Sequence, residues 1–190
     1  VGEILFGKTN PSGKLPVSFE KKWEDNPAFN NYYDPTNSKR VEYKEGIFIG
    51  YRYYDTKKVE PMFPFGFGLS YTTFKYSNLK VLISKKGKSP QATVSFNIRN
   101  TGSRDGAEVA QLYVRDVVSP VPRPLKELKG FSKVFLKSGE MKTVTMKLDE
   151  SAFAYYKTNL KKFGYDPGVF EILIGSSSAN IHLKEAIVVK

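Results

Sequence analysis

The chain of 190 residues contains no cysteine and a single histidine, His182. Without thiols it can form neither disulfides nor thiolate metal sites. One imidazole does not make a metal site, so we expect no metal and no cofactor. We interpret His182 as an ordinary strand residue, because no strained serine turn accompanies it to suggest a catalytic triad.

Long apolar runs are also missing. No stretch of 18 apolar residues occurs, so the sequence predicts no membrane span and no membrane partner. The formal charge is +11, which suggests nucleic acid or another anionic polymer as a partner. The lysines are scattered, however, and the dense group at residues 85–88 is typical of a hairpin tip. We therefore predict a solvated basic surface and no nucleic-acid partner, and steep salt dependence of binding would favour the alternative.

Residues 73–190 carry repeated strand signals separated by turn residues. Apolar and polar residues alternate at residues 93–100, 108–115 and 142–148, and this period of two predicts strands that bury one face. Further strands are expected at residues 74–83, 128–136, 169–175 and 181–189, and Asp149 is expected to cap one helical turn. Two antiparallel sheets packed face to face satisfy this pattern. We predict a mainly β fold with an immunoglobulin-like sandwich of the fibronectin type III kind, since no cysteine pair is present.

Residues 1–72 are irregular and show no core of their own. Residues 1–6 and 47–54 are β-prone, whereas residues 24–40 are polar and indicate a surface loop. A segment with so many loops needs something to pack on. The sequence therefore predicts an arm at residues 1–72 and a sandwich domain at residues 73–190, and the arm points to a missing partner, either upstream sequence or another chain.

Residues 60–71 hold two prolines, two glycines and four aromatic side chains. Proline fixes the backbone and removes donors, while glycine reaches angles that are closed to other residues. Neither an amphipathic helix nor an alternating strand has this composition. We predict a packed domain junction at Phe63, Phe65, Phe67 and Tyr71.

Candidates for chemistry are few, and we predict no catalytic residue in this chain. Residues 7–15 differ from a phosphate loop, because five residues rather than four separate the glycines and Leu15 replaces the Mg²⁺-binding Ser or Thr. Carboxylate pairs catalyse glycoside hydrolysis, but nothing holds the available ones at a defined separation, so we expect them to be solvated. The candidates are Glu24 with Asp25, Glu42 with Glu45, and Asp55.

Aromatic side chains in loops can bind sugars by stacking. Tyr32 and Tyr33 are the best candidates, because they lie in a polar loop. For these two side chains and for Tyr51, Tyr53 and Tyr54, however, packing in a core or an interface is the favoured interpretation.

Several segments together resemble the C-terminal end of a glycoside hydrolase family 3 β-glucosidase. They include NPSGKLPVSF at residues 10–19, YKEGIFIGYRYYD at 43–55, PMFPFGFGLSYT at 61–72 and PRPLKELKGF at 122–131. Shorter matches lie at residues 4–7, 100–102, 110–114 and 175–178, in the same order as in the family. The resemblance covers nearly the whole chain.

The resemblance implies a tail of an α/β sandwich domain, a linker and a fibronectin type III-like domain. It also implies that the nucleophilic Asp and the acid/base carboxylate lie upstream, in the barrel and in the α/β domain. The implied partners are those upstream domains or a companion chain, with a β-glucoside as the substrate of the full enzyme and a homodimer as an open alternative. A free-standing carbohydrate-binding or interaction module is the other hypothesis. An exposed aromatic surface would favour it, whereas buried Tyr113 and Tyr155 would not.

Overall fold

The computed structural model describes residues 1–34, 36–87 and 89–190. Helices α1 (Gly2–Leu5), η1 (Trp23–Asp25) and α2 (Tyr51–Lys57) precede all of the strands. The strands are β1 (Phe74–Lys86), β2 (Ser89–Asn100), β3 (Gly106–Asp116), β4 (Glu127–Leu136), β5 (Met141–Leu148), β6 (Tyr155–Lys157), β7 (Lys162–Gly164), β8 (Gly168–Gly175) and β9 (Ile181–Val189), with η2 (Glu150–Ala152) after β5. We call residues 1–72 the arm and residues 73–190 the sandwich; the boundary between them stays a prediction.

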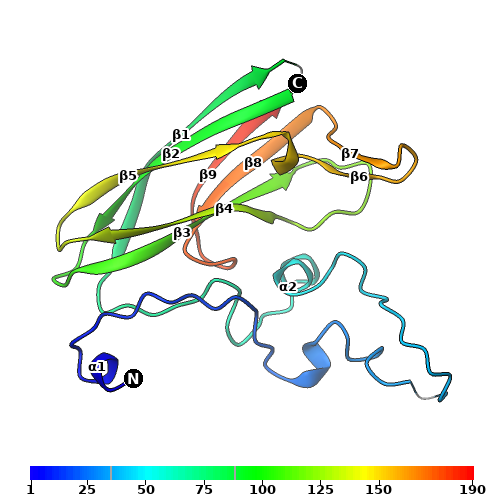
Figure 1. The fold of residues 1–190 in the computed structure, drawn as a ribbon, viewed down its shortest axis with the longest axis horizontal. Coiled ribbons are helices and arrows are strands. Elements are labelled where there is room, and N and C mark those ends of the chain that lie inside the picture. Colours follow the sequence, from blue (N-terminus) through cyan, green and yellow to red (C-terminus); the bar gives the residue numbers. More distant parts are fainter. Residues whose placement is uncertain (35, 88) are drawn as a thin grey trace.

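The sandwich has the predicted mainly β architecture. One sheet has the order β1-β2-β5 and the other the order β4-β3-β8-β9, with every neighbouring pair antiparallel, while β6 and β7 form a small separate hairpin. In Figure 1 the arm runs beneath the sandwich, on the side where β3 and β4 lie.

Alternating burial places the core between the two sheets. Ala92, Val94, Phe96 and Ile98 of β2 are buried, and so are alternate residues of β5. This confirms the sandwich that the period of two predicted. Asp149 also caps η2 as expected, since its carboxylate accepts a hydrogen bond from the Ser151 amide at 2.9 Å.

Strand β3 departs from strict alternation in its middle. Residues 110–114 are all buried, so both faces of the strand are covered there. One face points into the core. The other, with Gln111 and Tyr113, faces the arm, and this contact between sheet and arm is the candidate site.

Two strand predictions in the arm were wrong. Residues 2–5 form α1, and residues 51–57 form α2 rather than a continuation of a β-prone run. Gly50 starts α2 with a φ of +53°, and Lys58, in the left-handed conformation, ends it. A helix puts Tyr51 and Tyr54 on one face, and that packing outweighed the β preference of the individual aromatic residues.

Two hairpins of the sandwich differ in how well the sequence predicted them. The β6–β7 hairpin was missed, because each strand has only three residues and shows no usable alternation. The predicted hairpin tip lies between β1 and β2, where Lys86 pairs with Ser89 and Gly87 has a φ of +64°; Lys88 lies outside the described residues.

No helix in the described ranges is long and apolar enough to cross a membrane.

Candidate functional site: the contact between the arm and the sandwich

The proline- and aromatic-rich segment of the arm folds back on the beginning of the chain. Phe19 forms an isolated antiparallel bridge with Phe63, and their rings meet edge to face at 6.4 Å. The Leu15 amide donates to the Phe67 carbonyl, and the Gly66 amide donates to the Leu15 carbonyl, both at 2.8 Å. These bonds join residues 15–19 and 63–67 into one layer that lies on the sandwich.

Gly66 sits where this layer touches β3. Its carbonyl accepts a hydrogen bond from Nε2 of Gln111 at 3.2 Å. Its φ is +80°, and a Cβ atom at this position would lie 2.2 Å from Oε1 of Gln111. Only glycine combines this conformation with such a close approach.

Three aromatic rings continue the contact toward α2. The Tyr51 ring packs between Phe65, at a centroid distance of 4.9 Å, and Tyr113, at 5.9 Å. Tyr113 is fully buried and donates its hydroxyl hydrogen to Oε1 of Gln111. Burial raises the pKa of the Tyr113 hydroxyl and keeps it a neutral donor.

Polar contacts then fix α2 against the start of β4. The Leu128 amide donates to the Tyr51 hydroxyl at 2.8 Å, and Lys126 pairs with Asp55 at 2.6 Å. The Asp55 side chain is 15% exposed, so the expectation that it is solvated was wrong. Its burial raises the pKa of this carboxyl, and the Lys126 ammonium offsets part of the shift. Arg52 adds a contact of 3.0 Å with Glu127.

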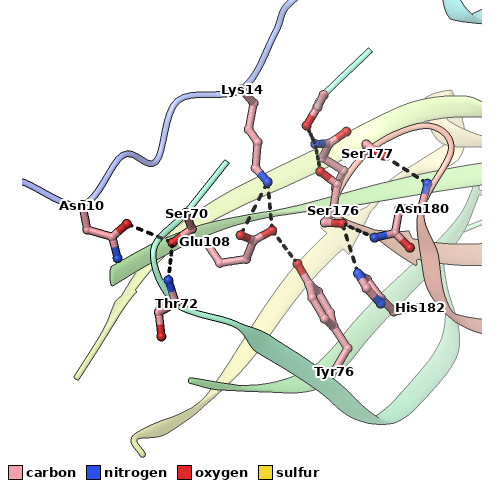
Figure 2. A network of polar contacts seen from close by, with 12 residues as sticks. Asn10, Lys14, Ser70, Thr72, Tyr76, Glu108, Ser176, Ser177, Asn180 and His182 are labelled. Carbon is pink, nitrogen blue, oxygen red and sulfur yellow. Dashed lines mark hydrogen bonds and ion pairs between the residues drawn. The ribbon is translucent and has the colours of Figure 1, made fainter. Parts of the chain in front are cut away.

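A further ion pair joins the arm to the other end of β3. Lys14 of the arm reaches Glu108 at 3.2 Å, and the two side chains are 15% and 6% exposed. Tyr76 donates its hydroxyl hydrogen to the same carboxylate at 3.0 Å (Figure 2). Burial and the negative charge of Glu108 both raise the pKa of the Tyr76 hydroxyl. The arm thus supplies the cation that balances a carboxylate buried in the sandwich.

His182 lies next to the Lys14–Glu108 ion pair, where it contacts the Tyr76 ring and the Ser176 hydroxyl. Its ring stacks on Tyr76 at a centroid distance of 4.3 Å, and Nε2 lies 3.1 Å from Oγ of Ser176. Burial, and then the charge of Lys14, lower the pKa of His182. His182 is an exposed residue of β9 that packs one face of its ring on Tyr76.

The junction residues lie along the arm but differ in exposure. Phe65 and Phe67 are half-buried, whereas Phe63 and Tyr71 are 38% and 45% exposed. The Tyr71 hydroxyl donates to the Ile4 carbonyl at 2.7 Å, and the Arg104 guanidinium lies 5.6 Å from the centre of the Tyr71 ring. Their role as a domain junction stays a prediction.

Tyr32 and Tyr33 extend from the arm into solvent. They are 59% and 72% exposed, and their rings meet edge to face at 5.0 Å. Trp23 lies 5.5 Å from Tyr32 and joins Phe29 at 6.0 Å, so four aromatic residues form one cluster. Sugar stacking by the two tyrosines stays a prediction.

No arrangement of carboxylates resembles a catalytic pair within the described ranges. Glu24 is exposed, Glu42 pairs with Lys44 at the surface, and Asp55 is paired with Lys126. Glu45 is half-buried, and its Oε2 has no hydrogen-bond partner. Nowhere in residues 1–34, 36–87 and 89–190 do three His, Asp or Glu side chains gather as metal ligands. The contact between the arm and the sandwich consists of packed aromatic rings, hydrogen bonds and ion pairs.

Three members of this contact, Gln111, Lys14 and Asp55, were not predicted from the sequence. One signal was available, because the alternation in β3 puts Tyr113 on the outer face, where a large ring needs a cover. The ion pairs had no such signal, since Lys14 and Glu108 are 94 residues apart.

Comparisons with known proteins match two different parts of the chain to two domain families. Residues 1–51 match the family described as glycosyl hydrolase family 3 C-terminal domain, and residues 108–178 match the fibronectin type III-like domain. The chain belongs to glycoside hydrolase family 3. It corresponds to the structural C-terminal portion of the family members that it matches.

Three similar proteins illustrate the match. Thermostable beta-glucosidase B of Acetivibrio thermocellus is 54% identical over 189 residues, which is 98% of this chain and 24% of that protein. Exo-alpha-(1->6)-L-arabinopyranosidase of Bifidobacterium breve is 44% identical over 95% of this chain and 23% of its own length. The crystal structure of the Bifidobacterium adolescentis GH3 beta-glucosidase superposes with a TM-score of 0.93 at 39% identity, covering 99% of this chain and 27% of that one. This chain therefore spans about a quarter of the length of its relatives.

Proposed function

We propose that the whole protein is a β-glucosidase that releases terminal non-reducing β-D-glucosyl residues, and that this chain supplies packing and stability. The observation that carries the proposal is the 54% identity with thermostable beta-glucosidase B over nearly the full chain. The catalytic carboxylates then belong to upstream domains, in agreement with the contact described above.

The outer side of the arm is proposed to pack on those upstream domains. Several large apolar side chains of the arm are mostly exposed to solvent in this chain, among them Phe6 at 86%, Tyr43 at 89% and Leu69 at 71%. Exposed apolar side chains on one region mark an interaction surface. The arm would thus lie between the upstream domains and the sandwich, with residue 72 as its last residue and Phe63, Phe65, Phe67 and Tyr71 at the junction.

The identity of the sugar is the sharpest test of the activity. The relatives include beta-glucosidases and arabinopyranosidases at similar identity to this chain, so the C-terminal portion does not separate the two. The whole protein should hydrolyse p-nitrophenyl β-D-glucopyranoside with a larger kcat/KM than p-nitrophenyl α-L-arabinopyranoside. The reverse order would contradict the proposal.

The structural role has its own test in the whole protein. Phe65→Ala should lower the melting temperature and leave kcat unchanged at a temperature where the protein is folded, since Phe65 packs on Tyr51. Phe163→Ala is the matched control, because that ring is 72% exposed and lies on the β6–β7 hairpin. A loss of kcat in the folded Phe65 variant would contradict a purely structural role.

A further inference from the structure

The outer face of the sheet β1-β2-β5 is open and basic. In this sheet Lys75 lies beside Arg99, Lys80 beside Ser95, and Thr93 beside Lys147. Directly paired residues of antiparallel strands share a face, and Lys86 follows on the same face as Lys80. The five cations Lys75, Lys80, Lys86, Arg99 and Lys147 are all exposed.

A bulge in β1 brings two of these lysines, Lys80 and Lys86, to the outer face. The register between β1 and β2 shifts between Ser77 and Lys80, and Asn78 has a φ of +56°. Before the bulge Tyr76 points into the core, and after it Leu79 and Val81 pack against the core. Because the bulge adds a residue, Lys80 and Lys86 point outward with Lys75.

Residues 74–86, 89–100 and 141–148, which form this sheet, include no aspartate and no glutamate. The outward positions between the cations carry serine, threonine, asparagine and glutamine, with Leu82 and Met141 as apolar exceptions. Among the described residues, none of the five cations has a carboxylate within 4.0 Å. Glu140 pairs with Lys142, whereas Asp149 and Glu150 line a cavity together with Lys86 at one end of the face. The five cations therefore have no direct ion-pair partner in the sandwich, and the two acids weaken the positive charge only near Lys86.

The dimensions of the face suit an extended anionic chain. Strands rise about 3.3 Å per residue, so Lys75 and Lys86 lie about 35 Å apart along β1, and neighbouring strands are about 4.8 Å apart. A linear polymer with regularly spaced negative charges can contact several of these cations at once. The hydroxyl and amide side chains between them can hydrogen-bond to sugar hydroxyls.

The composition of the face argues against single-stranded nucleic acid and neutral sugars as its ligands. Single-stranded nucleic acids are held by aromatic side chains on which the bases stack, and the paired positions of this outer face contain no aromatic residue. Neutral sugars would lack a stacking surface for the same reason. Charge and hydroxyl contacts without stacking are the chemistry of a uronic-acid polymer.

We propose that the outer face of the sheet β1-β2-β5 binds a linear polysaccharide that carries carboxylates. Each contact is an exposed ion pair and is weak, so binding depends on several simultaneous contacts and falls as salt screens them. The face lies on the sheet that the arm does not cover (Figure 1). The proposal goes beyond the proposed hydrolase function and does not rest on it, because it concerns binding alone.

The test uses polygalacturonate and its fully methyl-esterified form, which has the same backbone without the charges. Affinity electrophoresis of the full chain at low salt should show retardation by polygalacturonate that disappears as salt is added, and no retardation by the ester. The triple variant Lys80→Gln, Arg99→Gln and Lys147→Gln should reduce the affinity roughly tenfold or more.

A matched control removes the same charge elsewhere. Lys133→Gln, Lys162→Gln and Lys190→Gln also lower the net charge by three, and these lysines lie off the proposed face, on β4, on β7 and at the end of the sandwich. This variant should bind within about twofold of the parent, and circular dichroism checks that both variants are folded. Equal losses in both variants, equal binding of the ester, no binding at low salt, or tighter binding of a DNA oligonucleotide than of polygalacturonate would each overturn the proposal.

Discussion

The arm and the sandwich are stabilised in different ways. In the sandwich, alternate residues of the two large sheets meet in a shared core. In the arm, Tyr54 is the one buried hydrophobic side chain among the described residues, and more than half of the chain's large exposed apolar side chains lie there. Burial of Tyr54 raises the pKa of its hydroxyl to about 12. The arm therefore depends for its shape on contacts outside itself. In this chain those contacts are with the outer face of β3 and the start of β4.

The largest effect should come from the core of the sandwich. Phe96 is fully buried, so Phe96→Ala should lower the free energy of unfolding by about 4 kcal/mol through lost burial and a cavity. Phe19→Ala in the arm should have a much smaller effect, because that ring is 47% exposed. Denaturant titration of the chain measures both. Similar losses would show that the arm has a core of comparable importance.

The buried ion pair should be the next most sensitive feature. Lys14→Met should cost about 3 kcal/mol, because it leaves the Glu108 carboxylate buried without its cation. Lys21→Met is the control, since Lys21 also pairs with a glutamate but both side chains are exposed, and exposed pairs contribute little. The same titration distinguishes the two. An equally small loss for Lys14→Met would mean that the arm does not depend on this contact.

Glycine in the arm offers a second matched pair. Gly66→Ala should cost about 2 kcal/mol more than Gly46→Ala, although both glycines have positive φ, of +80° and +58°. A Cβ at Gly66 would collide with Gln111, whereas nothing lies within 4 Å of a Cβ at Gly46. Thermal unfolding of the two variants measures the difference. Equal melting temperatures would contradict a close contact between Gly66 and β3.

The smallest effect concerns pH. The folded protein lowers the pKa of His182 below its unfolded value of about 6.5, so the unfolded state binds the proton more readily. The contribution of neutral His182 is therefore present above that pH and is lost as the pH falls through the folded pKa. His182→Gln should remove the part of the stability loss seen between about pH 7 and pH 5. As the chain has one histidine, an unchanged pH profile in the variant would contradict this assignment.

The strands of the sandwich could be predicted because their information is local. Alternation in residues 93–100 and 142–148 marks which side chains enter the core, and the cap at Asp149 depends on neighbours two residues away. That no catalytic residue lies in this chain stays a prediction, made from the lack of any held carboxylate pair. The helix at Tyr51–Lys57 could not be predicted in this way, because its aromatic residues favour strands until β3 and Phe65 provide a surface to pack on.

The sequence by itself determined the alternating pattern, and with it the sandwich, its core and the family resemblance. Only the tertiary structure decided which distant residues meet. It pairs Lys14 with Glu108 across 94 residues and buries Tyr113 under the arm. It also gathers lysines that are scattered in the sequence onto one face of β1, β2 and β5. The physical reason is that burial and charge depend on distances in space. Strand register and the bulge in β1 set these distances, and the order of residues along the chain does not specify them.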